Sequence, residues 1–361
     1  MLDILRSLKS LVKVARTHID NEIFRLHYTF TVLVLLAFCI VVTTKQYVGD
    51  PIDCIHGHDV PSNIINTYCW IHTTFTIPSA FSKKVGKDIP HPGIDATQDE
   101  SQFRYHKYYQ WVCFMLFLQA TFFYIPRWLW RMWEGGKIQA LMMDLDVGML
   151  GEAEKKQKKK LLVDYIIASW KTHDWYAGRY LICEILAFLN VIGQMFLMNT
   201  FFDGEFMNYG LEVIDFINTD PEERIDPMIR IFPRVTKCRF QKYGPSANLE
   251  THDALCVMPL NIINEKIYIF LWFWFVILSI LTGFVLIFHA VLFACPPVRV
   301  YVLSMRFRFA HMENLHTLVR KGSFGDWFLI YMLGQNVDAI IFKELVAEIA
   351  KKVTTEPKEG L

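Results

Sequence analysis

Cysteine is the residue type whose placement in this 361-residue sequence points most directly to chemistry. Four of the eight cysteines form two pairs, and each pair lies in a polar segment between apolar runs: Cys54 with Cys69, and Cys238 with Cys256. The other four lie in or beside apolar runs: Cys39, Cys113, Cys183 and Cys295. Paired cysteines in polar segments predict disulfides in an oxidising compartment. Four cysteines allow three connectivities, and we favour two bridges that run between the two segments.

Enzymatic chemistry is not indicated. The sequence has no HExxH, CxxC, GxGxxG or GxxxxGK[ST] pattern. His56 and His58 have no companion ligand pair and are interpreted as part of a polar turn rather than half of a metal site. We therefore expect no enzyme, no catalytic residues, no cofactor and no metal.

One apolar run carries polar exceptions: Glu184, Asn190 and Gln194. An ionisable group inside a membrane usually faces a bundle interior or a water-filled path. Because Glu184 lies only four residues after Tyr180, a hydrogen-bonded position near the lipid headgroups is the alternative. The sequence leaves both open.

Membrane-spanning helices are the elements that must position these groups. Apolar residues make up 53% of the chain and aromatic residues 15%, with a net charge of +1, which excludes a disordered chain and a nucleic-acid binder. A spanning helix needs about 20 largely apolar residues. Four runs with at most one charge qualify: 26–44, 108–126, 180–202 and 267–298. Four aromatic residues at span ends are expected in the headgroup layer: Trp128, Trp130, Trp133 and Tyr180.

Four spans place both termini on one side of the membrane. The flanking segments on that side hold 24 Lys and Arg residues, against 13 in segments 45–107 and 203–266, and a positive bias favours the cytosol. Both cysteine pairs fall on the opposite side. The sequence therefore predicts cytosolic termini and extracellular, disulfide-bonded loops. No Asn-x-Ser/Thr sequon is present, so these loops are expected to be free to touch protein.

The predicted fold class is an all-α membrane protein, a four-transmembrane-helix bundle with a small disulfide-bonded α/β extracellular cap and a helical cytosolic domain. The expected segments in chain order are an N-terminal amphipathic helix (1–25), a first span (26–44), an extracellular loop (45–107), a second span (108–128), a cytoplasmic loop (129–179), a third span (180–202), a second extracellular loop (203–266), a fourth span (267–295) and a cytoplasmic C-terminal domain (296–361). Pro126 is expected to end or kink the second span close to its cytosolic end, with termination favoured over a gating hinge. A short strand is expected around 235–240.

Two basic segments leave alternatives open. In residues 1–16, Leu2, Leu5 and Leu8 share an apolar stripe with basic residues largely off it. Such a helix either lies on the inner leaflet or folds into a pore mouth. The basic run 155–160 is a solvated helix face or an anionic-lipid contact, with a dedicated calmodulin or phosphoinositide site as the alternative.

The sequence also resembles a known family, the innexins or invertebrate gap-junction proteins. The resemblance begins with the run Tyr108, Tyr109, Gln110, Trp111 and Val112, which is similar to the innexin signature pentapeptide. It continues in Gln46–Pro51, Cys69–Thr76, Asp203–Phe206, Phe232–Lys266 and Gly325–Tyr331, and so covers nearly the whole chain. Ala247 departs from the family, where close relatives usually show Gly. The sequence does not separate an insect innexin from an insect-virus innexin.

The resemblance implies a gap-junction channel. Subunits would form a homo-oligomeric ring of eight that docks with a second ring on the apposed cell and passes ions and small metabolites. It also implies disulfides joining Cys54 to Cys256 and Cys69 to Cys238, and a cytosolic pore mouth lined by Leu2, Leu5 and Leu8. Membrane lipids and other innexins are the remaining expected partners. The alternatives are an undocked hemichannel that releases metabolites and a four-span adhesion or scaffold protein.

Overall fold

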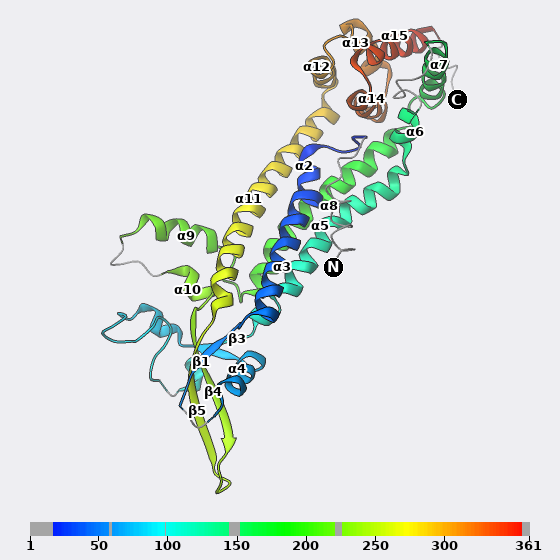
Figure 1. Cartoon of the computed structure of the whole chain (residues 1–361). Helices are drawn as coiled ribbons and strands as arrows, with labels where there is room; N and C mark the ends of the chain where they lie inside the picture. The colour runs from blue at the N-terminus through cyan, green and yellow to red at the C-terminus, as the bar shows by residue number, and fades with distance from the viewer. Residues whose placement is uncertain (1–16, 58–59, 98, 144–151, 221–225, 356–361) are drawn as a thin grey trace. The chain divides into compact units, whose positions relative to one another are not determined.

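The computed structural model of the chain describes residues 17–57, 60–97, 99–143, 152–220 and 226–355. Within these ranges, four helices are long and apolar enough to cross a membrane: Glu22–Val48, Val112–Glu134 (α5), Asp174–Phe201 (α8) and Pro259–Ala294 (α11) (Figure 1). The first is continuous through α2 (Glu22–Arg25), a π-helical stretch η1 (Leu26–Thr31) and α3 (Val32–Val48). The predicted fold class is confirmed.

The chain folds as two compact units. Residues 1–31, 122–190 and 278–361 belong to the first, termed the helical unit. Residues 32–121 and 191–277 belong to the second, termed the cap unit. Each unit draws on distant parts of the chain, so neither could be assigned from one contiguous stretch of sequence.

One detail of the predicted spans is wrong. Helix α5 continues through Pro126 to Glu134, so this proline does not end the helix; one missing backbone hydrogen bond is tolerated in a membrane-spanning helix. Two of the aromatic residues at span ends, Trp130 and Tyr180, are fully buried within the helical unit. The indole Nε1 of Trp130 donates to the Ile19 carbonyl (2.9 Å), and the Tyr180 hydroxyl accepts from the Asn21 backbone N–H (3.0 Å).

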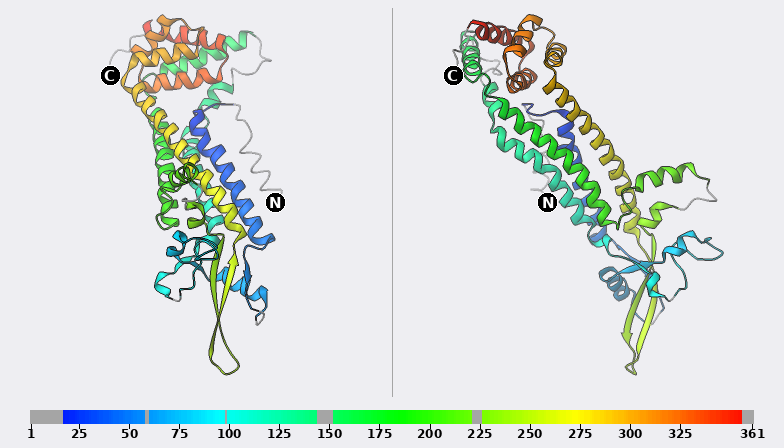
Figure 2. Two further views of the ribbon diagram at one scale, coloured as in Figure 1. Left: turned by 90° about the vertical axis from the view of Figure 1, so that its left-hand side faces the viewer. Right: turned by 180° about the vertical axis from the view of Figure 1, so that it is seen from behind.

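The cap unit contains a five-stranded antiparallel sheet in the order β1-β5-β4-β2-β3. The strands are β1 (Asp53–Ile55), β2 (Thr74–Thr76), β3 (Arg104–His106), β4 (Val235–Tyr243) and β5 (Leu249–Val257). The hairpin β4–β5 is the long ribbon of Figure 2. It extends well past the short strand that the sequence predicts, because polar residues continue the ladder to Tyr243 and Leu249.

Short helices surround this sheet. They are α4 (Ser62–Ile71), η2 (Pro78–Ser82), η3 (Glu100–Gln102), η4 (Tyr108–Gln110), α9 (Tyr209–Asn218) and α10 (Pro227–Ile231). Ile65 and Cys69 of α4 are buried in one cluster with Cys238, Cys256 and Met258 from the second loop. The two loops therefore share a single core.

The hairpin turn places Ala247 in a backbone conformation that favours glycine. The turn is closed by hydrogen bonds from the Gly244 N–H to the Asn248 carbonyl (2.9 Å) and from the Ala247 N–H to the Gly244 carbonyl (3.0 Å). Ala247 has a φ of 59°, in the left-handed region where a Cβ atom is unfavourable. Ala247→Gly is expected to raise the free energy of unfolding of the cap by about 1 kcal/mol. A melting temperature equal to that of the unmodified protein would contradict this expectation.

The helical unit joins the middle loop to the C-terminal segment. Its helices outside the spans are α6 (Lys137–Met143), α7 (Glu152–Ala168), α12 (Pro296–Arg306), α13 (Met312–Lys321), α14 (Phe324–Asn336) and α15 (Ala339–Thr355). Val163 of α7 and Val346 of α15 are fully buried in the same apolar core. Lys159 of the basic run binds two carboxylates of α15, Glu344 (2.9 Å) and Glu348 (2.8 Å). Part of the basic run therefore serves helix packing.

Asp326, at the start of α14, makes several polar contacts that position this helix. Its carboxylate accepts hydrogen bonds from the backbone N–H groups of Lys171 (2.9 Å) and Ser323 (3.0 Å) and contacts the Nδ1 of His173 (2.9 Å). Asp326 and Ser323 form a reciprocal capping box. Asp326 is 2% exposed, so water cannot replace it.

Asp326→Ala is expected to lower the free energy of unfolding of the helical unit by about 2–4 kcal/mol, because several buried donors lose their acceptor. Thermal unfolding of the detergent-solubilised protein measures this. Asp338→Ala is the matched control, since the exposed Asp338 makes a similar contact to the Ile340 N–H (2.8 Å). Equal shifts in melting temperature for the two variants would argue against the role of burial.

Candidate functional site

Two disulfides hold the cap unit together. Cys54 is bonded to Cys256, and Cys69 to Cys238, which is the pairing that the family resemblance implies. Cys54 and Cys256 are register partners on β1 and β5, whereas Cys69 reaches β4 from α4. All four cysteines are buried. Because the bridges span 202 and 169 residues, each ties the first loop to the second.

The cap cysteines are not available to a metal. The sulfur atoms of Cys54, Cys69 and Cys256 lie within 4.8 Å of one another, which is the spacing of a ligand cluster. Each is already bonded to another sulfur, and a metal requires the free thiolate. The chemistry of this cluster is therefore covalent cross-linking.

The signature residues connect the start of α5 to the disulfide-bearing helix α4. Tyr108, Tyr109 and Gln110 form η4, Trp111 follows it, and Val112 begins α5. The buried Tyr109 hydroxyl donates to the Cys69 carbonyl (3.2 Å).

The other four signature residues differ in their contacts and exposure. The Gln110 amide donates to the carbonyls of Trp70 and Ile71, the latter at 3.0 Å. The Tyr108 ring packs edge-on against Phe202 and Phe232. Val112 is fully buried, whereas Trp111 is 59% exposed. The signature thus connects α4 to the start of α5 and leaves one indole on the surface.

A chain of ion pairs crosses the cap from β3 to α9. Arg104 pairs with Glu205 (3.2 Å), Glu205 with Arg230 of α10 (2.7 Å), and Arg230 with Glu212 of α9 (2.6 Å). Near the start of α11, Arg234 contacts the fully buried Glu265 (3.0 Å). These pairs fix the orientation of α9 and α10 relative to the sheet.

His106 is a buried base of the sheet that the sequence did not single out. Its Nε2 shares a hydrogen bond with the Thr76 hydroxyl (2.8 Å) across the β2–β3 pair. Burial, with a smaller effect from the charge of Arg104, lowers the pKa of His106 from 6.5 to about 3. The folded cap therefore keeps this ring neutral.

This pKa shift predicts how stability depends on pH. Between pH 6.5 and pH 3 the unfolded chain binds a proton that the folded cap excludes. The contribution of His106 to stability should be complete above pH 6.5 and should fall by about 1.4 kcal/mol per pH unit as the pH decreases through this window. Melting curves of the protein and of His106→Gln, recorded from pH 7 to pH 4, measure the difference. Parallel pH profiles would rule out this role for His106.

Glu184 lies in the interior of the helical unit. Its carboxylate is 2% exposed, accepts a hydrogen bond from the Asn21 side chain (2.5 Å) and pairs with His289 Nδ1 of α11 (2.6 Å). Glu184 is therefore buried and hydrogen-bonded within this unit. On the same helix, Asn190 is partly buried and Gln194 is buried.

A second polar cluster surrounds Asp20, just before the first span. The buried Asp20 carboxylate pairs with Arg25 (3.1 Å) and Arg127 of α5 (2.7 Å) and accepts a hydrogen bond from the Tyr28 hydroxyl (2.8 Å). Sequence reasoning missed it: an acid five residues before Arg25 is the only local signal, and Arg127 is remote in sequence.

Residues 18–21 are held from several directions. The backbone N–H and carbonyl of His18 bind the Asn336 side chain of α14 (2.5 and 2.7 Å). The Ile19 carbonyl is bound by Trp130, and the Asn21 N–H by Tyr180. The predicted pore-lining residues Leu2, Leu5 and Leu8 precede this segment and lie outside the described residues.

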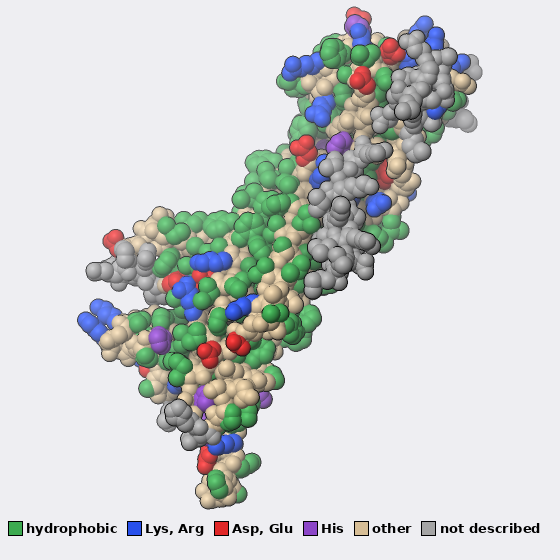
Figure 3. Space-filling model, in the orientation of Figure 1, with side chains coloured by type: hydrophobic (Ala, Val, Ile, Leu, Met, Phe, Trp, Pro, Cys, Tyr) green, Lys and Arg blue, Asp and Glu red, His purple; other side chains and the backbone are tan. Residues whose placement is uncertain are grey.

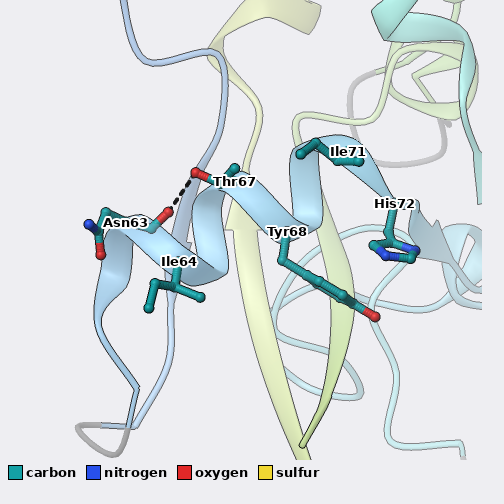
Figure 4. A pocket seen from close by; sticks show the side chains of 6 residues that line it. All are labelled: Asn63, Ile64, Thr67, Tyr68, Ile71 and His72. Carbon is teal, nitrogen blue, oxygen red and sulfur yellow. Dashed lines mark hydrogen bonds between the residues drawn. The ribbon is translucent and has the colours of Figure 1, made fainter.

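A groove of about 400 Å³ follows α4 in the cap unit (Figure 4). It is lined by Asn63, Ile64, Thr67, Tyr68, Ile71 and His72. Ile64 and Ile71 are 48% and 63% exposed. The Thr67 hydroxyl donates a hydrogen bond to the Asn63 carbonyl (2.8 Å). The groove is therefore lined by both apolar and polar side chains of α4 and the residue that follows it.

Four membrane-spanning helices and a cap built from two cross-linked loops define a multi-pass membrane protein. The family model "Innexin" matches residues 20–353. The chain is 56% identical to Innexin shaking-B of Drosophila melanogaster, over 98% of this chain and 95% of the relative. It is 52% identical to Innexin inx2 of Schistocerca americana, over 98% of both chains. The chain therefore belongs to the innexin family, and it is a gap-junction channel subunit rather than an enzyme.

Proposed function

We propose that eight copies of this chain form a ring around an axial pore, and that two rings on adjacent cells dock through their cap units. Permeants would be ions and small metabolites, selected by pore width and lining charge without a cofactor. The observation that carries this proposal is the double cross-link of the cap. It gives a rigid base to a long hairpin whose exposed Tyr243 (77%) and Leu249 (59%) are available for contact with an opposing cap.

The proposed orientation has extracellular caps and cytosolic termini. Disulfides between the two loops favour an oxidising compartment for the cap unit. The excess of Lys and Arg in the segments of the helical unit favours the cytosol for the other side. Both arguments point the same way.

The N-terminal segment is proposed to line the cytosolic pore mouth through Leu2, Leu5 and Leu8. Support comes from the residues that follow it, because the anchoring of residues 18–21 by α5, α8 and α14 gives the segment a fixed point of departure. The Asn21 side chain in this anchored segment donates to Glu184, and Glu184 pairs with His289.

The test is electrical and dye coupling between paired cells that express only this chain. Coupling of both kinds is the expected result, with eightfold symmetry in axial particle images of the purified protein. Dye uptake into single cells without transfer between cells would instead indicate an undocked hemichannel. Junctions that form and never conduct would leave adhesion as the function.

A further inference from the structure

Helix α9 of the cap unit is fastened to the fourth span. Gly210 lies directly on the Trp272 indole: a Cβ atom at Gly210 would come within 2.0 Å of the ring. The Trp272 Nε1 donates to the Met207 carbonyl (3.0 Å), just before α9 begins. Tyr209 and Val213 are buried on the same side. The helix is therefore held at the level of Trp272.

The polar side of α9 also has its partners within the cap. Glu212 pairs with Arg230 of α10, and Arg230 continues the chain of ion pairs through Glu205. In the views of Figures 1 and 2, α10 and the strands lie on one side of α9, and its other side is open.

The open side is apolar. Leu211, Ile214 and Ile217 are 55%, 40% and 69% exposed. Because they are three residues apart on one helix, their side chains run along one flank. Figure 3 shows hydrophobic atoms covering this flank of α9 and continuing over α11. Exposure of such an apolar surface to water is unfavourable.

The length of α11 indicates what covers it. Its 36 residues make a helix of about 54 Å, whereas the hydrocarbon core needs only about 20 residues. The part outside the core must include the start of the helix, because Glu265 and Lys266 lie there. The partly buried Trp274 follows these charges and marks an interface, and exposed apolar residues come after it at Ile277, Ile280 and Phe284. The contact between α9 and α11 at Trp272 therefore lies at the level where headgroups meet acyl chains.

We propose that α9 is an interfacial helix that lies on the bilayer leaflet nearest the cap and inserts Leu211, Ile214 and Ile217 among the lipid chains. Its apolar flank is continuous with exposed apolar residues of α11, and its acidic edge points back to α10. This contact would fix the distance between the cap unit and the bilayer surface. The inference does not depend on conduction or docking.

The test uses the full chain in phosphatidylcholine nanodiscs. A photoreactive benzophenone amino acid replaces Leu211, Ile214 or Ile217, one position at a time, and mass spectrometry identifies the adducts after illumination. Asp215, exposed on the polar side of the same helix, is the control position. Each variant is used only if it elutes as the unmodified oligomer does.

Lipid adducts at the three apolar positions, at least about tenfold more abundant than at Asp215, are the expected result. Adducts to a second copy of the chain would overturn the proposal by assigning the flank to a subunit interface. Absence of adducts at all three positions, or equal lipid labelling at Asp215, would overturn it as well.

Discussion

Cells that express Cys54→Ser are expected to lose electrical coupling, although the protein still reaches the membrane. The bridge to Cys256 secures β1, an edge strand of only three residues that pairs with β5 alone. So short an edge strand has little stability of its own. Removing a bridge that closes a loop this long costs about 2–5 kcal/mol, which lowers the folding equilibrium constant of the cap by about thirtyfold to several thousandfold.

The unpaired Cys256 makes the single variant worse. The Cys256 sulfur lies within 4.8 Å of the Cys69 sulfur, so a free thiol at this position can attack the remaining disulfide. The double variant Cys54→Ser, Cys256→Ser removes the attacking thiol. It should retain more correctly folded protein at the cell surface than the single variant does.

Two measurements decide this expectation. Junctional conductance between paired cells reports function, and alkylation of the remaining thiols followed by mass spectrometry reports the pairing. Cys295→Ser is the matched control, because Cys295 is an exposed, free cysteine. Normal coupling in Cys54→Ser would refute the structural role of this bridge.

The four spans were predictable because their signal is local. A bilayer tolerates few charges along about 20 residues, so the charge-free runs around Leu35 and Phe275 mark helices whatever the rest of the chain does. Helix ends were not predictable in the same way. The termination expected at Pro126 failed because bundle contacts beyond it, such as the buried Trp130, favour continuation of the helix.

The cap depends on long-range pairing. Neither β1 nor β2 has more than three residues, and both pair with strands that lie far along the chain. Local patterns indicated only one strand, in β4, where β-branched and aromatic residues alternate. The cysteines pointed to the junction of the two loops, but composition and spacing left three connectivities open.

The polar cluster at Asp20 was hidden for a related reason. Its main partner, Arg127, is 107 positions away in sequence, and at the end of a span an arginine is ordinarily interpreted as a headgroup contact. Only the fold shows that a single buried carboxylate pairs with two guanidiniums in the helical unit. The sequence therefore predicted a pore-lining role for Leu2, Leu5 and Leu8 but did not indicate the residues that anchor the segment following them.

Asp20→Ala is expected to destabilise the helical unit by about 3–5 kcal/mol, because it leaves the positive charges of Arg25 and Arg127 without their buried counter-ion. A double-mutant cycle with Arg127→Met isolates the pair: the double variant should be more stable than the sum of the two single losses predicts, with a coupling energy of about 2 kcal/mol or more. Thermal unfolding in detergent provides all four values, and additive losses would show that the pair contributes no coupling.

The same variant also tests the proposed pore mouth. Asp20 lies in the segment that connects residues 1–16 to the first span, so its loss should change the unitary conductance or voltage dependence of the channel as well as its stability. Asp326→Ala lowers the stability of the same unit from a position in α14, and it separates the two effects. If both variants shift gating equally for an equal loss of stability, the anchor at Asp20 acts only through folding. A change in gating confined to Asp20→Ala would mean that the segment it anchors is part of the permeation path.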